Sequence, residues 1–233
     1  MTTEPTEPTG PDLPSTRITR LAERQRDDRE ALYDVLDSAL VAHVAVVREG
    51  VPVVLPLLHA RDGERLLLHG STGGGLLREA AAGAPVTVAV TVVDALVVAD
   101  SLFESSANYR SAVIFGRCSV VPPDGRLAAL RALSDRLLPG RWTEVRPPTP
   151  KELAATLVLE MPLEHASVKV RTGPPSPADT SAEPPPDGVP LWWGIVPLAQ
   201  TPGEPVTAPD VPDGTPLPPS VLALLQQRSN TSL

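Results

Sequence analysis

The chain has 233 residues, of which 42% are hydrophobic and 3% aromatic, and its formal net charge is −8. This length allows one well-buried core with appendages, and the dominance of Val, Leu and Ala over aromatic residues favours β-strands packed through branched aliphatic side chains. The acidic balance excludes a general affinity for nucleic acid or for anionic membranes, so an anionic ligand would need a local group of cations.

Cysteine and histidine usage excludes the common metal sites. Cys118 is the only cysteine, so no intrachain disulfide or Cys-based zinc cluster can form, and its apolar strand context favours a buried, inert thiol. The histidines show no metal-ligand spacing, and no metal site is predicted. The N-terminus lacks an apolar signal segment, and the longest apolar run, 86–99, is too short to span a bilayer. We therefore expect a cytoplasmic protein.

The predicted elements begin after a polar tail. Residues 1–16 have the composition of a disordered segment, and apolar residues at helical spacing then predict a helix over 28–40. Residues 41–70 follow as three strands separated by polar turns that contain glycine. These strands are almost continuously apolar, so we expect protein to cover both of their faces.

Two prolines interrupt the second of these strands, 51–58. Because proline cannot complete a sheet ladder, Pro52 and Pro56 indicate either an edge strand or one that turns part of its backbone toward a ligand. The remaining core elements are predicted as a helix over 76–82, strands over 86–92, 95–99 and 111–121, a helix over 127–138, a short helix from Lys151, and strands over 157–160 and 166–171.

The composition changes from Gly173 onward. Fifteen of the 29 prolines lie between Pro174 and Pro219, so we expect this region to lack regular helix and sheet. The apolar island LWWGIVPL, 191–198, is expected to pack onto the body of the protein. The predicted organisation is a disordered tail over 1–16, a mainly β antiparallel domain with helical decorations over 17–172, and a Pro-rich C-terminal arm with a packed Trp-containing segment over 173–233.

A glycine-rich loop is the first candidate site. The stretch RLLLHGSTGGGLLREAAA, 65–82, places a strand, then His69, Gly70, Ser71 and Thr72, directly before a helix. Unpaired amides at a helix start bind anions, and the two hydroxyls add donors. The glycine spacing matches neither a Walker loop nor a dinucleotide fingerprint, so the loop fits an anion site or a flexible turn. His69 is the only histidine that we place in a candidate site, and no nucleophile–histidine–acid arrangement is visible.

Two further stretches carry unusual polarity within strands. Lys169 and Arg171 alternate with valines and share one strand face, from which they could bind a phosphate or simply face solvent. Four hydrogen-bonding side chains open the strand before 112, where a solvated turn is the alternative interpretation: Asn108, Tyr109, Arg110 and Ser111.

Several of these segments occur in an order that matches a known family. They are ERQRDDREALYDVLDSALVAHVAVV, VPVVLPLLHARDGERLLLHGSTGG, NYRSAVIFGR, LPGRW, KELAATLVLEMPLEHASVKVRTGPP and LWWGIVPL. The chain resembles the pyridoxamine 5′-phosphate oxidase-like flavin-binding split barrels, in the branch of flavin-nucleotide-binding proteins related to nitroimidazole-resistance nitroreductases. Residues 1–16 lie outside the resemblance.

The resemblance implies a six-stranded antiparallel FMN-binding split barrel that forms a homodimer, with the cofactor in the groove between subunits. It implies that the loop 69–72 holds the phosphate, that the strand carrying Val54 and Leu55 contacts the flavin ring through its backbone, and that residues 109–111 lie at or near the site. Lys169 and Arg171 match a basic pair, and we infer their contact with phosphate from charge. In the nitroreductase branch, the histidine that matches His69 is associated with activity.

The resemblance leaves the function open between two classes. The first is an FMN-dependent oxidoreductase acting on a small molecule such as a nitroaromatic or quinone. The alternative is a non-catalytic flavin- or haem-binding carrier, sensor or stress protein. Relatives often carry His or Arg where this chain has Asp100, Glu104 and Ser105, and some carry a basic residue where it has Gly75. These replacements favour the alternative or a changed substrate.

Overall fold

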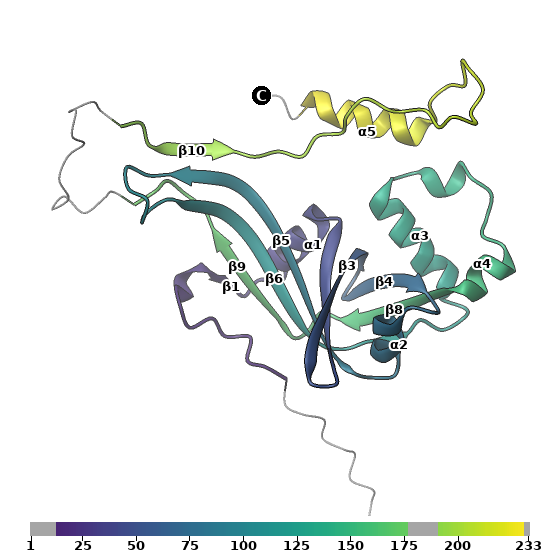
Figure 1. Ribbon diagram of the computed structural model, residues 1–233, viewed down its shortest axis with the longest axis horizontal. Coiled ribbons are helices and arrows are strands. Elements are labelled where there is room, and N and C mark those ends of the chain that lie inside the picture. Colours follow the sequence, from purple (N-terminus) through teal and green to yellow (C-terminus); the bar gives the residue numbers. More distant parts are fainter. Residues whose placement is uncertain (1–12, 177–190, 231–233) are drawn as a thin grey trace, which may run out of the picture.

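A computed structural model describes residues 13–176 and 191–230. Its strands form a curved antiparallel sheet in the order β1-β9-β6-β5-β2-β3-β4-β8-β7, with β10 paired to β5 (Figure 1). The strands are β1 (Gln25–Arg26), β2 (Val41–Arg48), β3 (Val51–Asp62), β4 (Arg65–Ser71), β5 (Pro85–Val98), β6 (Ser106–Arg117), β7 (Ser119–Val120), β8 (Thr156–Pro162), β9 (Ala166–Arg171) and β10 (Gly194–Pro197).

Helices decorate this sheet. They are η1 (Ala22–Arg24), α1 (Arg29–Ser38), α2 (Gly75–Ala81), α3 (Arg126–Leu137), η2 (Arg141–Thr143), α4 (Pro150–Ala155) and α5 (Pro219–Asn230). Within the described residues, each helix is too short or too polar to cross a membrane. The predicted mainly β, antiparallel split-barrel class is confirmed, with ten strands in the sheet rather than six, of which β1, β7 and β10 are short. Most of the predicted tail, residues 1–12, lies outside the described residues.

The strand β3 changes partners along its length. Residues 51–58 pair with β2, and His59–Asp62 pair with β4. Pro52 and Pro56 both lie in the half that has β2 as its partner and no second described strand, so the prediction of an edge strand is confirmed. The switch allows one continuous strand to connect the two halves of the sheet.

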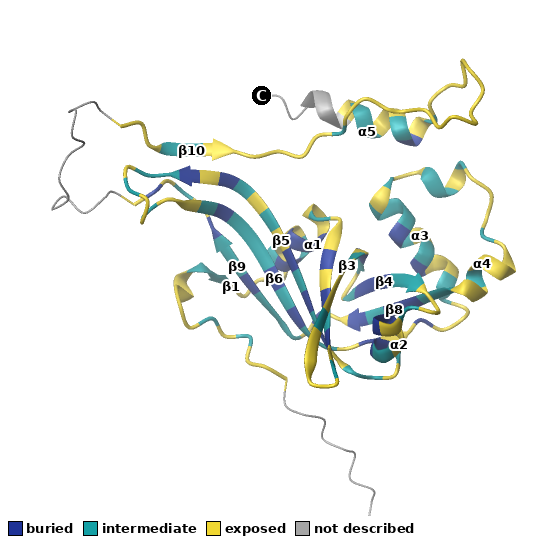
Figure 2. Ribbon diagram, viewed as in Figure 1, coloured by how far each residue is buried: buried dark blue, intermediate teal, exposed yellow. Residues whose placement is uncertain are grey.

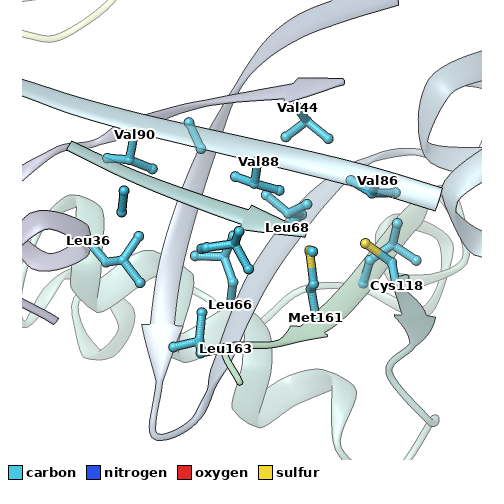
Figure 3. Packing of buried hydrophobic residues seen from close by; sticks show 14 of the residues in the cluster. Leu36, Val44, Leu66, Leu68, Val86, Val88, Val90, Cys118, Met161 and Leu163 are labelled. Carbon is cyan, nitrogen blue, oxygen red and sulfur yellow. The ribbon is translucent and has the colours of Figure 1, made fainter. Parts of the chain in front are cut away.

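The main core lies inside the curved sheet and beneath α1 (Figure 3). The predicted apolar stripe of α1 is buried through Leu32, Val35 and Leu36, and Asp28 caps the helix by accepting a hydrogen bond from Ala31 N. Cys118 packs in this cluster, where burial raises the pKa of its thiol to about 11. The thiol is therefore protonated at neutral pH, in agreement with the predicted inert role.

Two strand predictions are corrected by the structure. The segments predicted as separate strands over 86–92 and 95–99 form the single strand β5, with a register irregularity between Val93 and Ala95. Asp94 occupies that irregularity and binds Arg110, which explains a charged residue in an apolar strand. The strand predicted over 111–121 instead starts at Ser106, and its end separates into β7, which pairs with β8.

The C-terminal arm contains a strand and a helix, so the expectation that it lacks regular structure was wrong. The strand β10 pairs with the end of β5, and α5 begins at Pro219, because proline is well suited to the first turn of a helix. Residues 177–190, which carry part of the proline-rich sequence, lie outside the described residues. The Trp-containing segment docks through β10, but Trp192 and Trp193 remain 65% and 49% exposed in the single chain.

Gly70 permits a close approach between β4 and α2. A Cβ at this position would lie 2.4 Å from Leu77 Cδ1, and Leu77 is buried in the core. We expect Gly70→Ala to lower the free energy of unfolding by about 1–3 kcal/mol through overpacking, measured by urea denaturation. Gly203→Ala is the control, because a Cβ there would meet nothing within 4 Å. A Gly70→Ala midpoint equal to that of the wild type would contradict this packing.

Candidate functional site

His69 lies at the end of β4, where the strand leaves the core and the chain turns toward α2. The preceding residues Leu66–Leu68 are fully buried, and β4 pairs with β8 through His69 and Val158. The imidazole lines a cavity of about 480 Å³. The other lining residues come from α3, η2, α4, the loop between them and β8: Leu130, Trp142, Val145, Arg146, Pro148, Glu152, Leu153 and Thr156.

The chemical state of His69 is that of a neutral base. Its Nδ1 atom is buried and has no hydrogen-bond partner in the described part of the chain. Burial lowers the pKa of the imidazole below its usual value, so the ring is uncharged at neutral pH. Residues 13–176 and 191–230 hold no group of three or more metal-binding side chains. A lone neutral imidazole can still bind a metal that brings its remaining ligands with it.

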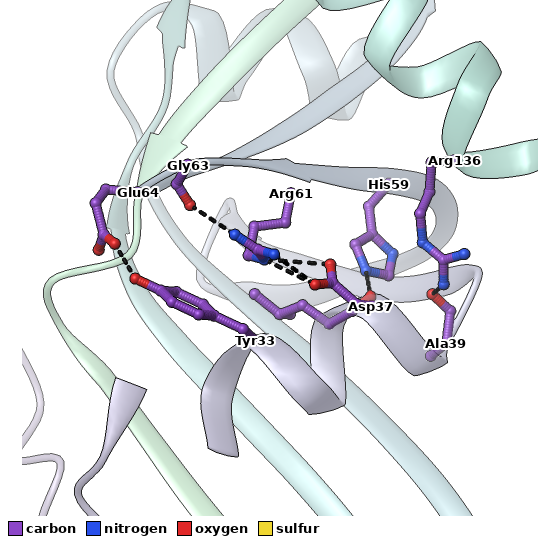
Figure 4. Close-up of polar contacts among 9 residues, drawn as sticks. Tyr33, Asp37, Ala39, His59, Arg61, Gly63, Glu64 and Arg136 are labelled. Atoms are coloured by element: carbon purple, nitrogen blue, oxygen red, sulfur yellow. Dashed lines mark hydrogen bonds and ion pairs between the residues drawn. The ribbon is translucent and has the colours of Figure 1, made fainter. Parts of the chain in front are cut away.

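A second buried histidine, His59, has a structural role (Figure 4). Its Nε2 lies 3.1 Å from the carbonyl oxygen of Leu36, which connects β3 to α1. Desolvation lowers the pKa of His59, so the neutral ring donates this hydrogen bond. Beside it, Arg61 forms an ion pair with Asp37, at 2.5 Å between Nη2 and Oδ2. These contacts hold β3 in place at the point where it changes partners.

Three backbone amides of the glycine-rich loop donate hydrogen bonds to acceptors within the chain. Thr72 N donates to Ala155 O at 3.0 Å, Gly74 N donates to Ser71 O at 2.9 Å, and Gly73 N donates to Ser71 Oγ at 3.2 Å. The sequence interpretation expected a row of free amides for an anion, but these three are already satisfied. The glycines here shape the entry to α2, and a bound phosphate would depend on side chains.

One such side chain, Arg48, was missed in the sequence. It ends β2, and its Nε donates to Glu79 Oε1 at 2.7 Å. Its Nη2 lies 2.9 Å from the position that a Cβ on Gly75 would occupy. The absence of a side chain at Gly75 therefore makes room for a cation supplied by β2. Arg48 was treated only as part of a turn, and no local pattern indicated that it returns to the loop.

Val54 and Leu55 are exposed apolar residues that point to opposite faces of β3. They are 52% and 43% exposed, and Val47, Val51 and Leu58 on the same two strands are exposed as well. In Figure 2 this part of β3 is coloured as exposed along most of its length. The expectation that protein covers these strands on both faces is therefore not met within a single chain.

The other predicted site residues lie on β6 and β9, and the strands β5, β2 and β3 separate them from β4 in the sheet. No hydrogen bond or ion pair between described residues joins them to the loop 69–72. They bind one another or nearby backbone: Arg171 Nη1 donates to Asn108 Oδ1 at 2.5 Å, Asn108 Nδ2 to Gly173 O, Lys169 Nζ to Arg20 O, and Ser111 Oγ to Lys169 O. Tyr109 is half-buried on β6.

Arg110 is fully engaged by carboxylates. Nη2 donates to Asp94 Oδ1 at 2.7 Å and Nη1 donates to Asp34 Oδ2 at 2.6 Å, while Nε also contacts Asp94. The hydrogen bond that Arg110 donates to Asp94, followed by the one it donates to Asp34, raises the pKa of Arg110 despite partial burial. The side chain thus connects α1 to β5, and an incoming phosphate would meet two carboxylates.

We expect Arg110→Gln to destabilise the fold by about 2 kcal/mol, because it leaves charged partners without their hydrogen bonds. Urea unfolding measures the loss. In an Asp94→Asn background the same substitution is expected to cost less than half as much, since the main partner is already neutral. Equal costs in the two backgrounds would show that Arg110 and Asp94 are not coupled.

The chain is similar in sequence to a known family. The family profile described as pyridoxamine 5′-phosphate oxidase matches residues 28–170. No curated protein matches the chain significantly.

Solved structures give further similarities. The FAD and haem binding protein from Mycobacterium smegmatis is 47% identical, with 86% of this chain and 97% of that one covered and a TM-score of 0.80. The flavocytochrome Anf3 from Azotobacter vinelandii is 32% identical, with 89% and 95% covered and a TM-score of 0.78. A candidate 5-nitroimidazole antibiotic resistance protein from Bacteroides thetaiotaomicron is 18% identical, with 63% and 86% covered and a TM-score of 0.53, which supports a shared fold.

Proposed function

Because the chain belongs to the pyridoxamine 5′-phosphate oxidase family, we propose that it is a flavin-dependent oxidoreductase that also binds haem. The two structures described above with more than 30% identity are named for such cofactors: one as a protein that binds FAD and haem, the other as a flavocytochrome. The similarity spans nearly all of those chains, so the proposal extends over the body of the protein and its C-terminal arm.

The observation that carries the haem assignment is the neutral, half-buried ring of His69, with its buried Nδ1 unpartnered among the described residues, in a largely apolar cavity of about 480 Å³. This volume is within the range of small-molecule and cofactor sites. His69 would hold the iron, and Leu130, Trp142 and Leu153 would keep water from the macrocycle. When bound, haem supplies one-electron redox chemistry, and the protein sets its environment.

For the flavin, we propose a site at the seam between two copies of the chain. The exposed, apolar half of β3 lacks a second described strand partner, so its outer backbone groups are available to the polar edge of the ring. The backbone of Val54 and Leu55 would lie against the ring, with the phosphate near Ser71, Thr72 and Arg48. FMN and FAD share the ring and this first phosphate. In this proposed site, the flavin does not contact residues 108–111, Lys169 or Arg171.

The acceptor that we propose at the flavin is a small planar molecule, such as a nitroaromatic or quinone. An open apolar surface along β3 favours flat, weakly polar rings. Anaerobic photoreduction of the flavin, followed by addition of a quinone or nitroaromatic, is expected to restore the oxidised flavin spectrum within the mixing time of a stopped-flow experiment. A reduced flavin that persists would favour a non-catalytic carrier or sensor.

An absorbance spectrum of the full chain tests both cofactor assignments. After incubation with haemin and with FMN or FAD, and removal of the excess, we expect a Soret band together with the near-ultraviolet and blue bands of a flavin. Chromatography of the flavin released by denaturation then identifies FMN or FAD. A colourless protein after these incubations would overturn the proposed function.

A further inference from the structure

The lining of the cavity beside His69 includes two charged residues. Among its lining residues Arg146 is the permanent cation and Glu152 the carboxylate, and the rest are apolar except Thr156 and the neutral His69. The lining therefore combines apolar side chains, a neutral imidazole and a guanidinium. A ligand that satisfies all three has an apolar body, a group that accepts an imidazole, and an acidic substituent.

Resting on the haem site proposed above, we propose that Arg146 is a specificity residue that binds a carboxylate of the porphyrin and so selects acidic tetrapyrroles over neutral ones. Arginine suits this task because its planar fork of donors matches the two oxygens of a carboxylate. The two propionates of haem are the acidic substituents that such a residue would recognise.

Arg146 can change partners without leaving a charge unsatisfied. It now binds Glu152 through Nη1 at 2.8 Å and Nη2 at 2.6 Å, and the two side chains are 66% and 49% exposed. Exposed ion pairs of this kind contribute little net stability. A ligand carboxylate in the cavity would therefore compete with Glu152 for Arg146.

Glu152 has a second role that keeps it in place. Its Oε2 accepts a hydrogen bond from Thr149 N at 2.7 Å, and its own amide donates to Thr149 Oγ1 at 3.3 Å, which forms the capping box of α4. The hydrogen bond from Arg146, with those from Thr149, lowers the pKa of Glu152 to about 2. When Arg146 moves to a ligand, the carboxylate remains ionised and bound to Thr149.

The test compares haemin with haemin dimethyl ester, which has the same ring and iron but no free carboxylates. Soret absorbance is followed as each porphyrin is added to the full chain. We expect Arg146→Gln to weaken haemin binding about tenfold, as for the loss of a charge-assisted contact, and to leave the ester unchanged. Arg131→Gln is the matched control: Arg131 also pairs with a carboxylate, Asp135 at 3.4 Å, but does not line the cavity.

A second variant removes the carboxylate that competes with the ligand for Arg146. Glu152→Gln retains a residue suited to the capping box but removes the charge that holds Arg146. It is expected to tighten haemin binding several-fold. Equal haemin affinities for the wild type and Arg146→Gln, with both variants folded by circular dichroism, would overturn the role of Arg146 while leaving the haem site intact. Absence of haemin binding to the wild type would overturn the haem site itself and this role with it.

Discussion

Replacing His69 with alanine is expected to abolish stable haem binding. Loss of a residue that only orients a metal ligand typically costs 10–100-fold in affinity, so loss of the ligand itself should cost at least about 100-fold. The measurement is a haemin titration followed by gel filtration, with the Soret absorbance that co-elutes with the protein as the readout. Flavin content is expected to stay at the wild-type level, because the flavin is assigned to the seam along β3.

Two controls separate ligation from misfolding in this experiment. His165→Ala removes a half-buried histidine whose Nε2 contacts Pro14 O at 2.7 Å and which does not line the cavity, so the variant should bind haemin as the wild type does. Free imidazole should restore protein-bound haem in His69→Ala, since it can occupy the space left by the ring. If His69→Ala binds haemin with the wild-type affinity and gives the wild-type Soret wavelength, His69 is not a ligand of the haem.

The substitution Leu55→Asp is expected to convert a dimer into monomers that have lost their flavin. Leu55 is 43% exposed in the single chain, and Val51 on the same face of β3 is exposed as well. A carboxylate buried in an apolar interface without a partner should weaken association by about 3 kcal/mol or more, which exceeds 100-fold. Light scattering measures the mass, and the absorbance of the eluted protein measures bound flavin.

A residue of similar exposure elsewhere provides the control for this prediction. Leu127 is 49% exposed in the first turn of α3, where an aspartate is also compatible with the helix dipole. Leu127→Asp should therefore leave both the mass and the flavin content unchanged. A wild-type protein that is monomeric, or a Leu55→Asp variant that remains a flavin-loaded dimer, would refute the proposed flavin site between two copies of the chain.

The features that were predictable from the sequence have local causes. Pro52 and Pro56 indicated an edge because each lacks a ladder donor, and the structure gives that half of β3 a single described partner. The core stripe of α1 and the ends of most strands followed from apolar periodicity and turn glycines. His69 was singled out by its position at the end of a strand beside the glycine-rich loop, and it does line a cavity.

The features that were missed depend on residues distant in sequence. Arg110 was expected near a phosphate, but its partners Asp34 and Asp94 lie 76 and 16 residues away, and no local pattern predicts their convergence. The cavity lining from Trp142 and Arg146 depends on how η2 and α4 pack beside β4 and β8. The arm was assigned no regular structure because prolines dominate its composition, yet four residues suffice for β10.

The position of β10 has a consequence for solubility. One side of β5 pairs with β6 along most of its length, while the other pairs with β2 only over 87–89 and with β10 over 95–98. Without β10, the far end of β5 would present bare amides and carbonyls to any extended peptide, which is how sheets recruit one another into aggregates. The C-terminal arm thus protects this edge of β5 from pairing with other chains. Variants that end before Gly194 should therefore aggregate on expression, unlike the full chain.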